Sequence, residues 1–244
     1  MRIYIGFDDT DTVDSDRGTG KLARWFEDEL PETCRLWGVV RQQLLLDDSI
    51  PYTSHNSSAC TVVETDNHCS VDDLISRAVR HIEHHFIPGS DPGLCVVSED
   101  HPALSRLIRF GRTCATRVVT QKEAIEAADG SHLSGHGGTN DGIIGAAAAV
   151  GLTANGWGGR FIEFGRVRAF QEEVLVSDLE RLGINVFSVD RDAQILAPED
   201  VIDTKGWLRP RLWGGKPVLP VTLKSKNLWE TLGEKRRKKN KKGG

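Results

Sequence analysis

Hydrophobic periodicity divides the first part of the chain into six elements. Residues 2–7 are rich in Ile, Tyr and Phe and predict a strand. Residues 20–30 carry apolar side chains at helical spacing and end at Pro31, which predicts a helix. Further strands are expected at 36–46 and 59–64, a second helix at 70–86 and a strand at 93–98. This order, β-α-β-β-α-β, is that of a ferredoxin-like unit.

The remainder of the chain predicts a second region of mixed structure. Helices are expected at 104–114, 121–128, 142–151 and 174–183, and strands at 161–170, 186–189, 195–197 and 218–223. The predicted fold class is therefore α/β (α+β). We expect a ferredoxin-like lobe over residues 1–98, a second α/β lobe over residues 99–230 packed with it, and a basic disordered tail over residues 231–244.

Composition agrees with a folded protein outside membranes. Hydrophobic residues make up 39% of the 244 positions, enough to bury a core and to exclude general disorder. The longest apolar run, residues 143–152, is about half of the ~20 residues that a membrane span needs. With no signal-peptide pattern at the start, we expect a cytoplasmic protein with no membrane partner.

The charge is unevenly distributed along the chain. The net charge is −4, but residues 234–244 carry seven Lys or Arg and one Glu, a charge of +6, which leaves −10 on residues 1–233. Such a tail is either a solvated, disordered end or a nonspecific arm for tRNA or another RNA.

The cysteines and histidines do not indicate a metal site. Five scattered cysteines form no C-x-x-C pair, so we expect neither structural zinc nor a disulfide framework, and most should be buried thiols. His81 and His85 lie four residues apart on the second predicted helix, and we expect structural or exposed roles for them.

The most informative motif is acidic and directly follows the first predicted strand. Asp8, Asp9 and Asp11 surround Thr10, so three carboxylates lie within four residues. Their mutual repulsion favours a hard, oxygen-seeking cation such as Mg²⁺, and a solvated acidic turn is the alternative. The three aspartates are therefore candidate metal ligands and catalytic carboxylates.

A small, glycine-containing sequence follows within ten residues and opens the first predicted helix. Gly18, Thr19, Gly20 and Lys21 place backbone N–H groups and one cation where a phosphate can bind. The sequence does not match a P-loop, because Ser15 and Leu22 stand where that motif needs Gly and Ser or Thr. Together with the carboxylates it predicts phosphoryl or nucleotidyl transfer.

Two further polar loops are candidate parts of the site. Residues 50–58 are dense in hydrogen-bond donors and include Asn56, and residues 135–142 are rich in glycine and include Asn140 and Gly142. We expect Asn56, Asn140 and Gly142 to line the cofactor site, and plain surface loops are the alternative.

These motifs together resemble the archaeal isoleucine-tRNA agmatinylcytidine synthetase family. The resemblance covers about residues 3–170 and rests on four segments in the order of the family. They are the DDTD of residues 8–11 with Thr19, the loop DSIPYTSHN of 48–56, the DPGL of 91–94 and the GIIGAAAAVG of 142–151.

The resemblance implies an ATP- and Mg²⁺-dependent enzyme with a kinase-like lobe. In the family, ATP activates the wobble cytidine of a tRNA by phosphorylation, agmatine displaces the phosphate, and a threonine at the position of Thr19 is itself phosphorylated. It implies cofactor contacts from Thr10 and the neighbouring loops. The sequence departs from the family at Gly20, where a threonine is usual, and at Asp141, where an arginine is usual.

The resemblance leaves the substrate open. The family continues into an OB-fold and a zinc ribbon, and we expect neither in this sequence, so a related substrate, a separate RNA-binding subunit or a homo-oligomer is as compatible as the tRNA reaction itself. Two other functions also fit: a non-catalytic nucleotide- or RNA-binding module, and a kinase for a small metabolite.

Overall fold

The computed structural model describes residues 1–50, 56–65, 69–191 and 194–233. The described chain forms two compact units. Unit 1 comprises residues 1–165 and 212–215, and unit 2 the rest from residue 166. The first unit extends well beyond residue 98, because the helices that follow pack on the same sheet as the first strands. Most of the expected basic tail, residues 234–244, lies outside the described residues.

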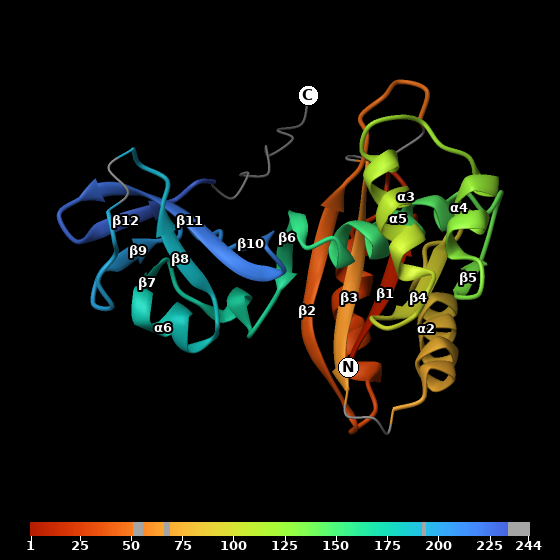
Figure 1. Ribbon diagram of the computed structural model, residues 1–244, viewed down its shortest axis with the longest axis horizontal. Helices are drawn as coiled ribbons and strands as arrows, with labels where there is room; N and C mark the ends of the chain where they lie inside the picture. The colour runs from red at the N-terminus through yellow and green to blue at the C-terminus, as the bar shows by residue number, and fades with distance from the viewer. Residues whose placement is uncertain (51–55, 66–68, 192–193, 234–244) are drawn as a thin grey trace, which may run out of the picture. The chain divides into compact units, whose positions relative to one another are not determined.

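Unit 1 begins with the predicted order of elements. These are β1 (Arg2–Asp8), α1 (Thr19–Trp25) with a 3₁₀ turn (Phe26–Glu29), β2 (Cys34–Gln43), β3 (Ser57–Thr65), α2 (Val71–His85) and β4 (Gly93–Ser98). The strands lie in the order β4-β1-β3-β2 and every neighbouring pair is antiparallel. The ferredoxin-like arrangement is therefore confirmed, and the fold class is mixed α/β (Figure 1).

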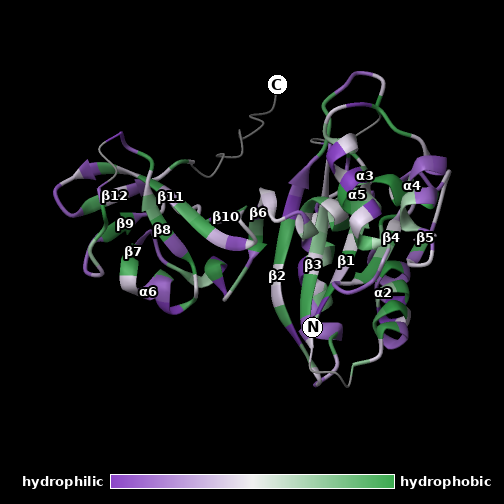
Figure 2. Ribbon diagram, in the orientation of Figure 1, coloured by the Kyte–Doolittle hydropathy of each residue, from purple (hydrophilic) through white to green (hydrophobic). Residues whose placement is uncertain are grey.

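Helices cover both faces of this sheet, so its strands are hydrophobic on both sides. On one face, Ile3, Ile5 and Phe7 of β1 pack against α1 and α2. On the other, Cys60 and Val62 of β3 pack against the helices that follow β4. Figure 2 shows β4 largely in green, as expected for a strand buried on both faces.

The second face carries three helices. They are α3 (Leu104–Cys114), α4 (Gln121–Ala128) and α5 (Gly142–Ala154), and the sheet is extended by β5 (His132–Gly135) beside β4 and by β6 (Trp157–Glu163) beside β2. Helix α5 crosses α3 closely: a Cβ on Gly151 would lie 1.9 Å from the carbonyl oxygen of Leu107. The small residues of α5 thus let it lie directly on the sheet and on α3.

Unit 2 is smaller and built mainly from strands. Its elements are a 3₁₀ turn (Val167–Ala169), β7 (Glu173–Leu175), α6 (Val176–Arg181), β8 (Asn185–Ser188), β9 (Val201–Asp203), β11 (Lys216–Ser225) and β12 (Leu228–Thr231). Between β9 and β11, β10 (Arg211–Trp213) leads back into unit 1, where Gly215 N–H donates to Gly156 O at 2.9 Å. The expected strand at 195–197 is wrong, because those residues are not in a strand.

Two further expectations from the sequence can be compared with the structure. Cys60, Cys95 and Cys114 are buried thiols, as expected, but the expectation of no disulfide framework is corrected at one pair, because Cys34 and Cys69 are disulfide-bonded. Within the described part of the chain, every helix is too short or too polar to cross a bilayer.

Candidate active site

The first carboxylate of the acidic motif is buried at the end of β1. Asp8 faces α5, where a Cβ on Gly145 would lie 1.7 Å from its Oδ2, so only glycine leaves room for the carboxylate. Burial raises the pKa of Asp8 to about 8, and the nearby charges of Asp9 and Asp11 act in the same direction. Asp8 is therefore largely protonated near neutral pH unless a bound cation stabilises its carboxylate form.

Asp9 directs the chain out of the strand. Its φ is +49°, in the left-handed region that few non-glycine residues adopt. Its carbonyl oxygen accepts from Asp91 N–H at 3.1 Å, which fixes this turn against the segment before β4. Burial raises the pKa of Asp9 to about 6, and the charges of Asp91, Asp11 and Asp141 act in the same direction.

Asp11 and two threonines form a hydrogen-bonded group at the start of α1. Thr19 donates to Asp11 Oδ1 from its backbone N–H at 3.0 Å and from its hydroxyl at 3.2 Å. Thr19 Oγ1 in turn accepts from the backbone N–H and the hydroxyl of Thr10, at 3.3 and 3.1 Å. Both threonines are buried, so the hydroxyl of Thr19 is held in one orientation and donates its hydrogen bond to the Asp11 carboxylate.

Burial also affects the acceptor of that proton. It raises the pKa of Asp11 above its ordinary value, although the two hydrogen bonds from Thr19 oppose the shift. A carboxylate with a raised pKa is a better base than a free aspartate. The Asp11–Thr19 pair therefore has the geometry of a base and an activated hydroxyl.

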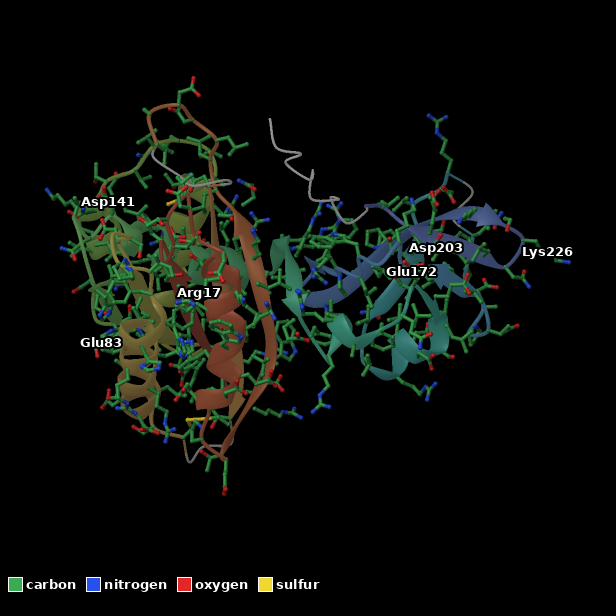
Figure 3. All side chains as sticks on the ribbon, turned by 180° about the vertical axis from the view of Figure 1, so that it is seen from behind. Arg17, Glu83, Asp141, Glu172, Asp203 and Lys226 are labelled. Atoms are coloured by element: carbon green, nitrogen blue, oxygen red, sulfur yellow. A yellow bond between two sulfur atoms is a disulfide. The ribbon has the colours of Figure 1, made fainter. Side chains whose placement is uncertain are left out.

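Asp91 is a further candidate site residue, for which no sequence motif indicated a role. Its carboxylate accepts from the backbone N–H groups of Thr139, Asn140 and Asp141 and from the hydroxyl of Thr139, at 2.6 to 3.0 Å. It thereby holds the loop that leads into α5. Asp141, labelled in Figure 3, and Asp91 bring two more carboxylates to Asp9. The only signal was the DPGL match, which assigned no role to this aspartate.

Ser58 is a second residue that sequence reasoning missed. The register pairs Phe7 with Ala59, so the next positions, Asp8 and Ser58, lie side by side on the same face of the sheet. Ser58 is 1% exposed, and its hydroxyl has no hydrogen-bond partner among the described residues. Its position beside Asp8 follows from strand pairing, which no local motif reveals.

The predicted phosphate loop is only partly directed toward the carboxylates. Gly18 precedes α1 and lies against Asp11, and Gly20 lies against Ile162 of β6, where a Cβ would be 2.9 Å from Ile162 Cδ1. The ammonium of Lys21 lies 4.9 Å from the ring centre of Trp25. Arg17, labelled in Figure 3, donates to the carbonyl oxygen of His85 at 3.2 Å.

The three predicted residues of the outer loops have other local contacts. Asn56 donates to Leu45 O at 2.7 Å and so closes the loop between β2 and β3. Asn140 packs over Gly135 and lines an open pocket of about 430 Å³ beside α4 and β5. Gly142 lies against the Asp91 carbonyl, 2.0 Å from where its Cβ would be, so close packing alone accounts for this glycine. Residues 51–55 of the matched loop lie outside the described residues.

The carboxylates fit a Mg²⁺ site in which the protein supplies only some of the ligands, and water and substrate phosphates supply the rest. Among the described residues, no three His, Cys, Asp or Glu side chains are arranged to hold a metal by themselves. Asp11 is engaged with Thr19, whereas Asp8 and Asp9 keep oxygen atoms whose negative charge is unfavourable without a cation. Mg²⁺ commonly binds one or two carboxylates and completes its shell with water and substrate phosphates.

Comparisons with known proteins agree with this α/β fold. No family model matches the sequence, and no curated protein sequence matches it significantly. Among solved structures, a tRNA fluorescent labeling enzyme is 28% identical with a TM-score of 0.53, over 62% of this chain and 36% of that chain. The agmatidine synthetase TiaS, in complex with an isoleucine tRNA and ATP, is 27% identical with a TM-score of 0.53, over the same shares.

A third structure extends the match. TiaS in complex with the same tRNA, AMPCPP and agmatine is 26% identical with a TM-score of 0.53, over 74% of this chain and 44% of that chain. The resemblance to the agmatinylcytidine synthetase is therefore confirmed. The chain spans well under half the length of these proteins.

Proposed function

We propose that the protein is an ATP-dependent phosphoryl-transfer enzyme that modifies tRNA or a related RNA. The observation that carries the proposal is the joint placement of two groups at the end of β1. One is the buried carboxylate pair Asp8 and Asp9, and the other is the hydroxyl of Thr19 held on Asp11 at 3.2 Å. Phosphoryl transfer is catalysed mostly by positioning and by neutralising charge, which these groups supply.

Thr19 is the proposed first acceptor. Asp11 takes the proton of the Thr19 hydroxyl as Oγ1 forms a bond to the γ-phosphorus of ATP, and the bond from that phosphorus to the bridging oxygen of ADP breaks. The two hydrogen bonds from Thr10 orient Oγ1 for this step. Transfer from Thr19 to a cytidine oxygen, followed by displacement of the phosphate by an amine, completes the reaction implied by the resemblance.

The nucleotide and the metal are assigned to the same end of β1. Asp8 and Asp9 are the residues that would hold Mg²⁺, which when bound neutralises charge on the phosphates. Gly18, Gly20 and Lys21 stay candidate cofactor contacts, with the Thr19 backbone N–H already committed to Asp11. Asp91 keeps the loop into α5 in place and so positions Asp9.

The substrate class rests on the similar proteins. The solved structures of TiaS are described as complexes with an isoleucine tRNA, with ATP or AMPCPP, and with agmatine, and they share 26 to 27% identity with this chain. A separate RNA-binding subunit or a homo-oligomer is the further partner that we propose for contacts to the tRNA.

The proposal is tested by incubating the full chain with Mg²⁺ and ATP labelled at the γ-phosphate. We expect label on the protein and phosphate release. Thr19→Val should abolish the protein label, and Asp8→Asn should slow ATP cleavage by about 10²-fold or more. Asp14→Asn, at an exposed aspartate of the same loop, is the matched control and should behave like wild type. Unchanged cleavage in Asp8→Asn, or no ATP binding by the wild type at millimolar concentration, would refute the proposal.

A further inference from the structure

Two arginines lie directly opposite each other in unit 1, outside the acidic site. Arg41 on β2 and Arg160 on β6 are partners in the antiparallel ladder, so their side chains leave the same face of the sheet. Like charges placed directly opposite each other destabilise a sheet. A pair that the fold keeps in this position is suited to a ligand of opposite charge.

Within the part of the chain that the structure describes, this pair has no acidic partner. Neither arginine forms an ion pair with a carboxylate among the described residues, and the Nε of Arg41 donates to the hydroxyl of Ser57 at 2.9 Å. Arg160 is exposed, whereas Arg41 is half-buried. Burial, together with the charge of Arg160, lowers the pKa of Arg41.

The pair lies at the same end of the sheet as the candidate active site. Arg41 is opposite Ala59 of β3, and Ala59 is opposite Phe7, the residue before Asp8. Two strand spacings separate β1 from β2, about 10 Å. Ala59 and Phe7 face α1, so the arginines lie on the face of the sheet from which Thr19 approaches.

An exposed aromatic side chain precedes Arg160 on the same strand. Trp157 is 62% exposed, although large aromatic residues are mostly buried in folded proteins. It packs beside the turn at Gly214, whose Cβ would lie 3.8 Å from the indole. Trp157 and Arg160 are three residues apart on β6, and single-stranded nucleic acids are commonly bound by an aromatic ring that stacks on a base together with a guanidinium that contacts a phosphate.

We propose that Arg41 and Arg160 bind a backbone phosphate of a single-stranded RNA segment next to the reacting nucleotide, and that Trp157 stacks on one of its bases. This inference rests on the proposed function and adds the surface that receives the substrate. The ligand is RNA rather than ATP because two strand spacings separate Arg41 on β2 from the carboxylates at the end of β1. A neighbouring nucleotide spans that separation while the reacting one stays at the carboxylates, and a base is the natural partner of Trp157.

The test is a titration of the full chain into a fluorescently labelled RNA hairpin with an unpaired loop, followed by anisotropy. Arg41→Gln and Arg160→Gln should each weaken binding about tenfold and lower the slope of log affinity against log salt by about one. Trp157→Ala should weaken binding about fivefold with an unchanged salt slope. Arg112→Gln, at an exposed arginine on α3, is the control and should leave the affinity unchanged.

A second arm measures ATP binding by the same variants. We expect wild-type ATP affinity in all of them, and Arg41→Lys should restore part of the RNA affinity while leaving the buried stem in place. Wild-type RNA affinity in both arginine-to-glutamine variants, no binding of the hairpin by the wild type, or a selective loss of ATP affinity would overturn the inference. These results can be told apart from a failure of the proposed function, in which the wild-type chain would not cleave ATP at all.

Discussion

The position of the Asp8 carboxylate depends on the absence of a side chain at residue 145. Because a Cβ there would lie 1.7 Å from Asp8 Oδ2, Gly145→Ala must displace either the carboxylate or α5. We expect a loss of about 1–3 kcal/mol in the free energy of unfolding. We also expect loss of most ATP cleavage, because Asp8 leaves its position. Denaturant titration and the labelled-ATP assay measure the two effects.

A variant at a second glycine of the same helix distinguishes the loss of stability from the loss of ATP cleavage. Gly151→Ala also produces a clash in α5, with the carbonyl oxygen of Leu107 at 1.9 Å, but against α3 and away from the carboxylates. It should destabilise the protein to a similar extent while the folded fraction cleaves ATP normally. Equal losses of activity in the two variants would contradict a specific fit between Gly145 and Asp8.

The site residues that could be predicted are those that are local in sequence. Asp8, Asp9, Thr10, Asp11 and Thr19 lie within twelve positions, and the structure brings all five together. Asp91 and Ser58 join them only through strand pairing and a loop contact between distant segments. Sequence spacing contains no record of such contacts, so neither residue could be assigned in advance.

At the scale of elements, α2 contributes a buried histidine to the core. His81 is 3% exposed, its Nε2 lies 3.0 Å from Leu22 O, and the rings of Phe7 and Phe26 lie beside it. Burial lowers the pKa of His81. Below about pH 6.5 the unfolded chain therefore binds a proton that the folded chain resists, and the free energy of unfolding falls as the pH falls.

We predict that His81→Leu reduces this pH dependence. Urea denaturation between about pH 7 and about pH 5 should show a shallower loss of stability in His81→Leu than in wild type. His84→Leu changes an exposed histidine of the same helix and should keep the wild-type slope. Equal slopes in wild type and His81→Leu would show that His81 does not contribute to acid sensitivity.

A third prediction concerns the start of α4. Thr120 and Glu123 form a reciprocal capping box, in which the threonine hydroxyl accepts from the Glu123 N–H and the glutamate accepts from the Thr120 N–H at 2.9 Å. Thr120→Ala should lower the free energy of unfolding by about 1 kcal/mol. Thr120→Ser should largely restore it, and ATP cleavage should be unchanged in both. A neutral Thr120→Ala variant would contradict the role of the cap.

The elements that periodicity found are long and amphipathic, and those it missed are short. The six elements to residue 98 follow the predicted order, because their apolar residues recur at helical spacing in the helices and form short apolar runs in the strands. The four-residue strand β5 has the sequence HLSG, whose His, Ser and Gly resemble a loop, and it forms a strand because β4 offers a free edge. The strand expected at 161–170 instead spans Trp157–Glu163, with two glycines near its start.

At the scale of the whole molecule, the charge distribution predicts how the protein meets RNA. Residues 1–233 carry −10 and residues 234–244 carry +6, so the tail is the part of the sequence most attractive to a polyanion. Deleting residues 234–244 should weaken RNA hairpin binding and lower its salt dependence, while ATP cleavage is unchanged. Unaltered RNA affinity after the deletion would leave the Arg41–Arg160 pair as the main contact and contradict a role for the tail.

The length of the chain bears on the same question. It spans 36 to 44% of the length of the TiaS structures it resembles, and the acidic site bears on the proposed ATP chemistry rather than on selection of one tRNA. Adding a candidate RNA-binding subunit in trans would therefore be expected to raise RNA affinity without changing the nucleotide site.

The most direct test of the central claim is a crystal structure of the full chain with a non-hydrolysable ATP analogue and Mg²⁺. We predict density for the γ-phosphate beside the Thr19 hydroxyl and for a cation on the carboxylates of Asp8 and Asp9. A nucleotide bound elsewhere on the protein, with the Asp8–Thr19 region unchanged and free of phosphate, would contradict it.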